Sequence, residues 1–129
     1  MIAPVTGSAF MIAVFAVGGG AGTAARVAIR ELLAARGVSA AWVILGVNLV
    51  GAALAGAVLG AVPDPESSVR MVAVAFLSGW TTYSAFSTDF LGAVREGRRG
   101  RAAALWLGTI GATPFVAGLA ARIASGAVP

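Results

Sequence analysis

The stretch FLSGWTTYSAFSTDF, from Phe76 to Phe90, is apolar enough for a membrane helix and yet carries six aliphatic hydroxyl side chains. The six aliphatic hydroxyls belong to Ser78, Thr81, Thr82, Ser84, Ser87 and Thr88, and Tyr83 adds a phenolic one. A segment that only had to cross a bilayer would use Leu and Val. The composition therefore predicts a helix that handles a polar species at membrane depth.

The rest of the chain also has the composition of a membrane protein. Of its 129 residues, 59% are hydrophobic and 11% are charged, whereas soluble domains are about 25% charged. A spanning helix needs roughly 17–25 apolar residues. Four segments of about that length carry no charged side chain, namely 1–25, 37–63, 71–88 and 102–121. They leave no polar remainder for a soluble core, so we predict a multi-pass protein of the cell membrane.

The expected architecture is a single all-α domain over residues 1–129 with four transmembrane helices. We place the helices at Ser8–Ala35, Ala40–Val62, Ser68–Gly97 and Arg99–Ser125. Two prolines in the PDPESS connection end the second helix, and Ser67 can cap the third. Residues 1–25 lack the basic start of a signal peptide, so we expect them to form a mature first helix.

Several functional classes are excluded or disfavoured. The chain has no Cys and no His, and its few acids lie mostly at the ends of the predicted spans, so no catalytic constellation is present and we do not expect an enzyme. Its net charge of +4 comes from arginines near span ends, where they meet lipid headgroups rather than nucleic acid. No nucleotide-binding motif is present, which favours passive transport.

Two stripes of residues recur every four positions. One holds Gly18, Gly22, Arg26 and Arg30, and the other holds Asn48, Ala52, Gly56 and Gly60. Small residues at this spacing let helix backbones approach closely in lipid. The alternative is that this spacing arises by chance, because the chain contains 18 glycines. Each stripe also carries a strongly polar group. Arg26 can snorkel to the interface or face the protein interior, and Asn48 can bridge helices or line a pore.

The opening stretch combines aromatic rings with a weak point in the helix. Ser78–Thr82 favours a break, because it contains Gly79 and two β-branched threonines. A break at membrane depth frees carbonyls that can coordinate a cation. Tyr83 and Phe86 share a face, and their ring edges can contact an anion. The alternative is an ordinary helix whose hydroxyls bond back to their own backbone.

These residues resemble the CrcB-like family of fluoride channels, also called Fluc. A family motif close to GGxxGAxxR is matched by GGAGTAAR at Gly19–Arg26, and a second-helix motif by VNLVGAALAG at Val47–Gly56. The family's GGxTTFSTFSxE is matched by SGWTTYSAFSTD at Ser78–Asp89. Three motifs in the same order, with similar length and span number, make the resemblance specific.

The resemblance implies an antiparallel dimer that exports cytoplasmic fluoride passively, with a structural sodium ion at its centre. It implies a sodium site made of backbone carbonyls from Ser78, Gly79 and Thr81. The implied fluoride path is lined by Asn48, Tyr83, Phe86, Ser84, Thr82 and Arg26. Three departures stand out: Tyr83 replaces a usual Phe, Trp80 is large for its place, and no Tyr or Ser lies between Arg101 and Ala124. We therefore expect helix four to contribute a degenerate polar track.

The arginines predict a fixed orientation. If the termini face outward, seven arginines face the cytoplasm (26, 30, 36, 95, 98, 99 and 101) and two face outward (70 and 122). This imbalance predicts that both termini lie outside. An antiparallel homodimer needs a balanced count, so we expect pairing with an oppositely inserted homologue. The alternatives are a non-conducting structural subunit of such a pair and a small multidrug-type transporter, which the lack of a membrane carboxylate in residues 1–25 disfavours.

Overall fold

The computed structural model describes residues 5–127 of the chain, and the fold is all-α as predicted. Its helices are α1 (Val5–Ala34), α2 (Ala40–Ala61), α3 (Ser68–Trp80), α4 (Tyr83–Arg95), α5 (Arg99–Trp106), the π-helix η1 (Leu107–Ala112) and α6 (Thr113–Ala124). The predicted outer bounds agree with these to within three residues. Ser67 is the N-cap residue of α3, although its hydroxyl makes no capping hydrogen bond.

Three helical rods in the described part of the chain are long and apolar enough to cross a membrane: Gly7–Ala34, Ala40–Ala61 and Arg99–Ala124. The last of these is α5, η1 and α6 in continuous succession. The remaining predicted span consists of α3 and α4, each of 13 residues, separated at Thr81 and Thr82. The expected break in helix three is therefore confirmed.

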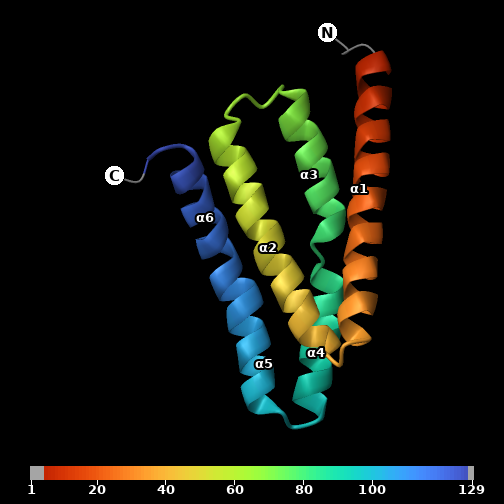
Figure 1. The fold of residues 1–129 in the computed structure, drawn as a ribbon, viewed down its shortest axis with the longest axis vertical. Coiled ribbons are helices and arrows are strands. Elements are labelled where there is room, and N and C mark those ends of the chain that lie inside the picture. Colours follow the sequence, from red (N-terminus) through yellow and green to blue (C-terminus); the bar gives the residue numbers. More distant parts are fainter. Residues whose placement is uncertain (1–4, 128–129) are drawn as a thin grey trace.

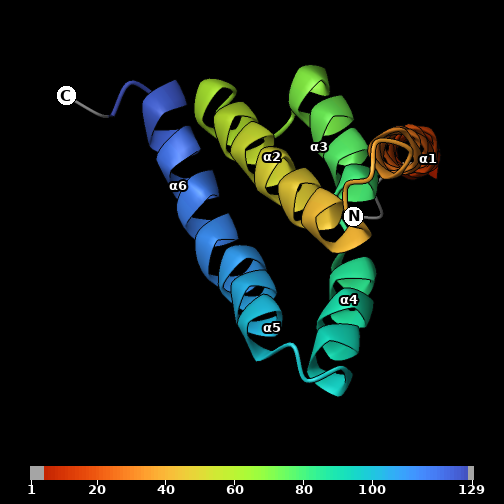
Figure 2. The same ribbon diagram turned by 60° about the horizontal axis from the view of Figure 1, so that its bottom comes forward.

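The helices form two close pairs that meet in the middle. α1 packs along α3, α2 packs along α6, and α2 also contacts α3 (Figure 1). The α2–α3 connection lies at the same end as the start of α1 and the end of α6, and the α1–α2 and α4–α5 connections lie at the opposite end (Figure 1). In Figure 2, α4 turns away from α3 and pairs with α5. The break thus lets the chain leave the α1–α3 pair and continue toward α5.

Glycines set the closeness of both pairs. A Cβ atom added to Gly22 would collide with the backbone carbonyl of Phe76 on α3. On α2, a Cβ at Gly56 or Gly60 would collide with the carbonyls of Ala117 and Ala121 on α6. The small-residue stripes therefore allow the backbones of α1 and α3, and of α2 and α6, to approach closely, as their spacing predicts.

The single chain has a small core and a largely apolar exterior. A buried cluster of Ala41, Ile44, Phe86 and Leu105 joins α2, α4 and α5. Large apolar side chains such as Phe10, Val17 and Phe115 are mostly exposed. In water such a surface would aggregate. It suits a protein whose exterior contacts lipid or another subunit.

Candidate functional site

The break between α3 and α4 is two residues of extended backbone. Thr81 has φ −78° and ψ 153°, and Thr82 has φ −151° and ψ 125°. The Thr81 amide makes the last helical bond of α3, to Leu77. The Thr82 hydroxyl accepts a hydrogen bond from the Ala85 amide at 3.4 Å and so caps α4. The threonine pair ends one helix and starts the next.

Asn48 on α2 clamps this break. The Thr82 amide donates to Asn48 Oδ1 at 3.0 Å, and Asn48 Nδ2 donates to the Thr82 carbonyl at 3.1 Å. Because a backbone N–H can only donate, the pair of bonds defines which end of the Asn48 amide faces which group. Asn48 is 5% exposed. Asn48 thus bridges α2 and the break, which is one of its two expected roles. Its Nδ2 has two N–H groups, and only one of them is used in the bond to Thr82.

Trp80, which is large for its place, is accommodated by Gly51. The indole N–H of Trp80 donates to the Val47 carbonyl at 2.9 Å. A Cβ at Gly51 would lie 2.8 Å from Trp80 Cδ1 and 2.5 Å from Thr81 Cγ2. The missing side chain at Gly51 therefore makes room for both residues next to the break.

Arg26 lies against the carboxyl end of α3. Its Nε donates to the Gly79 carbonyl at 3.3 Å, and the Thr23 hydroxyl donates to the same oxygen at 3.3 Å. A guanidinium is favourable there because the carboxyl end of a helix carries partial negative charge. Arg26 therefore ties α1 to the end of α3 through the Gly79 carbonyl.

A cavity of about 690 Å³ opens beside the break. Of the predicted site residues it is lined by Asn48, Ser78, Thr81, Thr82 and Tyr83. Arg26, Gly79, Ser84 and Phe86 are not among its lining residues. The wall also includes Thr109 and Thr113, from η1 and α6. Residues from three separate parts of the chain thus meet around one hollow, whose wall is mostly apolar and carries a few polar side chains.

Several hydroxyls of the opening stretch are already engaged. Ser78 donates to the Ala75 carbonyl at 2.7 Å and Thr81 to the Leu77 carbonyl at 3.0 Å. Ser87 and Thr88 likewise bond back to their own helix. For these four side chains the alternative of ordinary back-bonding is what the structure contains. Their protons are therefore not free to be donated into the cavity.

Tyr83 and Phe86 lie together but differ in exposure. Their ring centroids are 5.5 Å apart with planes inclined at 55°. Phe86 is 4% exposed and packs in the core, whereas Tyr83 is 69% exposed. The two rings also line a second hollow of about 410 Å³, together with Phe90 and Trp106. Tyr83 and Ile110 border both hollows.

The span Arg99–Ala124 has no Tyr or Ser after Arg101, but it contributes the hydroxyls of Thr109 and Thr113. Thr113 donates to the Gly108 carbonyl at 3.3 Å, and the Thr109 oxygen is buried without a hydrogen-bond partner among the described residues. Pro114 has no N–H and weakens the helix before it, where the π-helical turn of η1 forms. Two threonines four apart beside a proline in an apolar run were the signal for this feature.

Comparison with known proteins identifies relatives. The sequence profile of the family described as CrcB-like protein, Camphor Resistance (CrcB), matches residues 13–124. The "Fluoride-specific ion channel FluC 1" of Streptomyces coelicolor is 33% identical in an alignment of 92 residues that covers 68% of this chain and 60% of that protein. The protein of the same name from Rhodococcus jostii is 36% identical over 85 residues, 66% of this chain and 62% of that protein.

A third relative, "Fluoride-specific ion channel FluC 2" of Streptomyces avermitilis, is 34% identical over 87 residues, covering 64% of this chain and 55% of the relative. The chain thus spans about three fifths of the length of the curated relatives it matches. No solved structure matches the chain significantly.

Proposed function

Because this chain belongs to the CrcB-like family, we propose that it is a subunit of a fluoride-selective channel that lowers cytoplasmic fluoride by passive export. Relatives named as fluoride-specific ion channels support this proposal, and membership in a family of ion channels confirms the expectation that the chain is not an enzyme. A multi-pass helical architecture, as observed here, is the setting that the activity requires.

The observation that carries the proposal is the clamped amide of Asn48. Its orientation is set by two hydrogen bonds to Thr82, and it borders a cavity of about 690 Å³. The second N–H of Nδ2 is a neutral donor that can replace part of a small anion's hydration shell without trapping the anion. Tyr83 and Phe86, which line the second hollow, would continue the path with positive ring edges, and the mutually bonded hydroxyls of Thr82 and Ser84 would lie beside it. We place Arg26 at the approach to the path, where its charge attracts anions.

We also propose that backbone carbonyls at the end of α3 bind a structural sodium ion. In residues 5–127 no hydrogen bond reaches the carbonyls of Ser78 and Thr81, and the Thr82 amide that would bond to Ser78 goes to Asn48 instead. These two carbonyls suit a cation. The Gly79 carbonyl accepts from Arg26, whose charge would oppose a nearby cation, so we assign the ligand role to Ser78 and Thr81. A bound sodium ion would supply positive charge at this negative helix end.

We further propose that the subunit inserts with both termini outside and pairs with an oppositely inserted homologue. Both arginine-bearing connections lie at one end of the molecule (Figure 1). The opposite end carries Asp64, Glu66, Arg70 and Arg122, whose formal charges cancel. Such asymmetry favours one orientation. A homologue with the reverse asymmetry would complete an antiparallel dimer.

A second candidate is a non-conducting structural subunit of the same pair. The burial of Phe86 in the core favours it, since a ring that is 4% exposed offers little edge to an ion. In this case the partner would supply the residues that conduct fluoride.

Fluoride efflux from liposomes tests the proposal. We expect no efflux from this chain alone and efflux when an oppositely oriented homologue is added. Tyr83→Ile and Phe86→Ile would then each lower efflux if this chain lines the conducting path. Robust efflux from the chain alone would contradict the paired arrangement, unchanged efflux in both variants would favour the structural subunit, and silence with the homologue would contradict the channel.

The buried hydroxyl of Thr109 tests whether the span Arg99–Ala124 contributes to the fluoride path. We expect Thr109→Val to lower fluoride efflux by about two- to tenfold, the worth of one hydrogen bond. Stability should not fall, because the Thr109 oxygen has no partner to lose among the described residues. Thr88→Val is the control, since the Thr88 hydroxyl bonds to its own helix and lines neither hollow. Equal efflux in the two variants would contradict a role for Thr109.

A further inference from the structure

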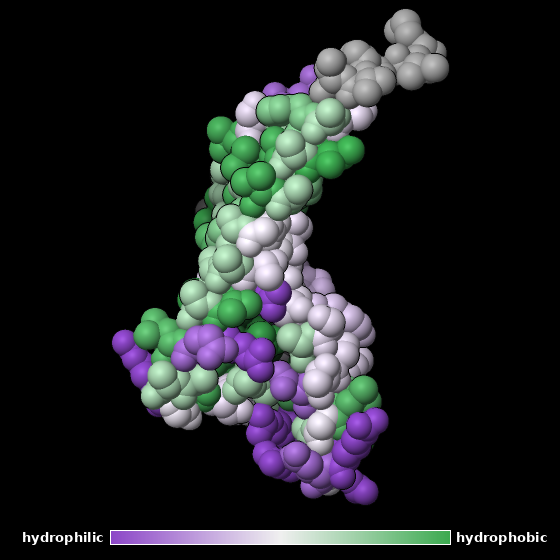
Figure 3. All heavy atoms as spheres, turned by 90° about the vertical axis from the view of Figure 1, so that its right-hand side faces the viewer, coloured by the Kyte–Doolittle hydropathy of each residue, from purple (hydrophilic) through white to green (hydrophobic). Residues whose placement is uncertain are grey.

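The end of the molecule formed by the α1–α2 and α4–α5 connections concentrates positive charge, and we call it the basic end. It carries Arg30, Arg36, Arg95, Arg98, Arg99 and Arg101 against two acids, Glu31 and Glu96. Its formal charge is therefore +4, whereas the opposite end is neutral. Much of the strongly hydrophilic surface in Figure 3 lies in the lower part of the molecule, below an apolar surface.

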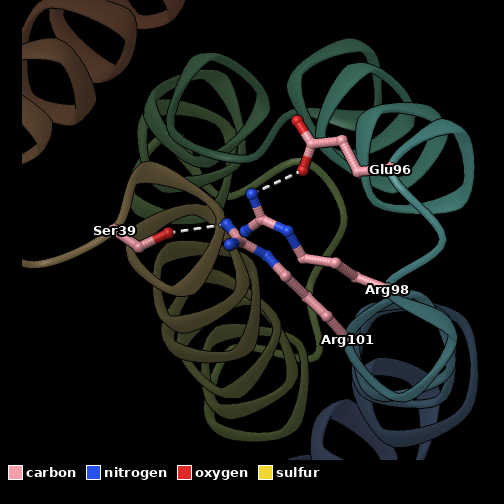
Figure 4. A network of polar contacts seen from close by, with 4 residues as sticks. All are labelled: Ser39, Glu96, Arg98 and Arg101. Atoms are coloured by element: carbon pink, nitrogen blue, oxygen red, sulfur yellow. Dashed lines mark hydrogen bonds and ion pairs between the residues drawn. The ribbon is translucent and has the colours of Figure 1, made fainter.

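The geometry leaves most of this charge uncompensated. Arg98 pairs with Glu96 at 2.6 Å, both about half exposed. Arg101 donates to the neutral hydroxyl of Ser39 at 2.7 Å, which ties the start of α5 to the start of α2 (Figure 4). In the described part of the chain, Arg98–Glu96 is the only ion pair. Arg95 and Arg99 are exposed and remain available to an external anion.

Apolar side chains continue directly from the basic end along the same helices. Val94 on α4 and Leu107, the residue after α5, are 50% and 59% exposed, and neither lines the second hollow beside Tyr83. The span Arg99–Ala124 begins at the basic end itself. The arginines therefore lie at the boundary of the hydrocarbon, at the depth of phospholipid phosphates.

We propose that the basic end binds the headgroup of an acidic phospholipid through Arg95 and Arg99 and through Arg98, which stays half exposed beside Glu96, with the acyl chains against Val94 and Leu107. A free anion would use only the charge, whereas an acidic lipid matches both the charge and the adjoining apolar surface. Each basic residue near an anionic lipid surface strengthens binding by about fivefold.

The experiment measures the thermal stability of the purified assembly that contains this chain, in neutral detergent. Phosphatidylglycerol, phosphatidylcholine with the same acyl chains, and inorganic phosphate are added separately. We expect phosphatidylglycerol to raise the Tm at concentrations at least tenfold below phosphatidylcholine, with no effect of phosphate. The triple variant R95Q/R98Q/R99Q should lose this preference, and the control R70Q/R122Q, at the opposite end, should keep it.

Two outcomes would overturn the proposal. One is an unchanged phosphatidylglycerol preference in the triple variant, and the other is an equal response of the wild type to both lipids. An equal response to inorganic phosphate would assign the basic end to free anions instead. The wild type alone provides a test that needs no variant: raising the salt from 50 mM to 0.5 M should abolish the preference, because exposed charges are screened. A preference that survives high salt would contradict the proposal.

Discussion

Asn48→Asp is expected to abolish fluoride efflux. The substitution removes both N–H donors of the Asn48 amide and places a carboxylate oxygen opposite the Thr82 carbonyl, where Nδ2 now donates at 3.1 Å. The Thr82 carbonyl loses its donor, which costs about 1–3 kcal/mol. A negative charge beside the cavity also repels an incoming anion, and its cost at membrane depth is about 2.5 kcal/mol or more.

The measurement is efflux from liposomes containing this chain with its homologue, together with the elution profile of the purified variant. Gly46→Ala is a matched control, because this position lies on the same helix and a Cβ there meets nothing within 4 Å. A folded Asn48→Asp variant with normal efflux would show that the ion does not pass Asn48. Loss of the folded peak would mean that the substitution prevents folding, so that the efflux result would say nothing about the ion path. Asn48→Ser, which keeps one donor, would then be measured, and partial efflux is the expected result.

Gly56→Val is expected to cause a large loss of stability, because Gly56 lies at the close contact between α2 and α6. A Cβ at Gly56 would collide with the backbone of Ala117, so a helix and not a side chain must move. Overpacking of a tight contact costs typically about 1–3 kcal/mol, and we expect the upper end because backbone cannot rotate away. The α2–α6 pair would separate, and the cavity wall that carries Thr109 and Thr113 would shift with it.

Thermal denaturation followed by size-exclusion chromatography measures this effect. Gly46→Val is the matched variant, since it makes the same change on the same helix at an exposed position. It carries the same cost of a β-branched residue in a helix and none of the collision. Equal loss of the folded peak in both variants would mean that the close approach of α2 and α6 contributes nothing to stability.

Features that depend on neighbouring residues in the chain could be predicted from the sequence. The four apolar runs predicted the helices and their bounds, because span length depends only on consecutive residues. The glycine stripes predicted close helix contacts, although Gly22 could not be matched to Phe76 or Gly56 to Ala117 before the helices were placed. The break was predicted from Ser78–Thr82 and occurs within it, at Thr81 and Thr82.

The sequence by itself determined the class of the protein, the positions of its helices, the break and the concentration of arginines near one pair of connections. These follow from hydropathy, backbone propensity and charge, which act over a few neighbouring residues. Only the tertiary structure decided that Asn48 clamps Thr82, that Arg26 meets Gly79, that Phe86 is buried and that Thr109 borders the cavity. Each of these is a contact between residues 20 or more positions apart or between separate helices, and such contacts depend on how the helices pack, which no local pattern encodes.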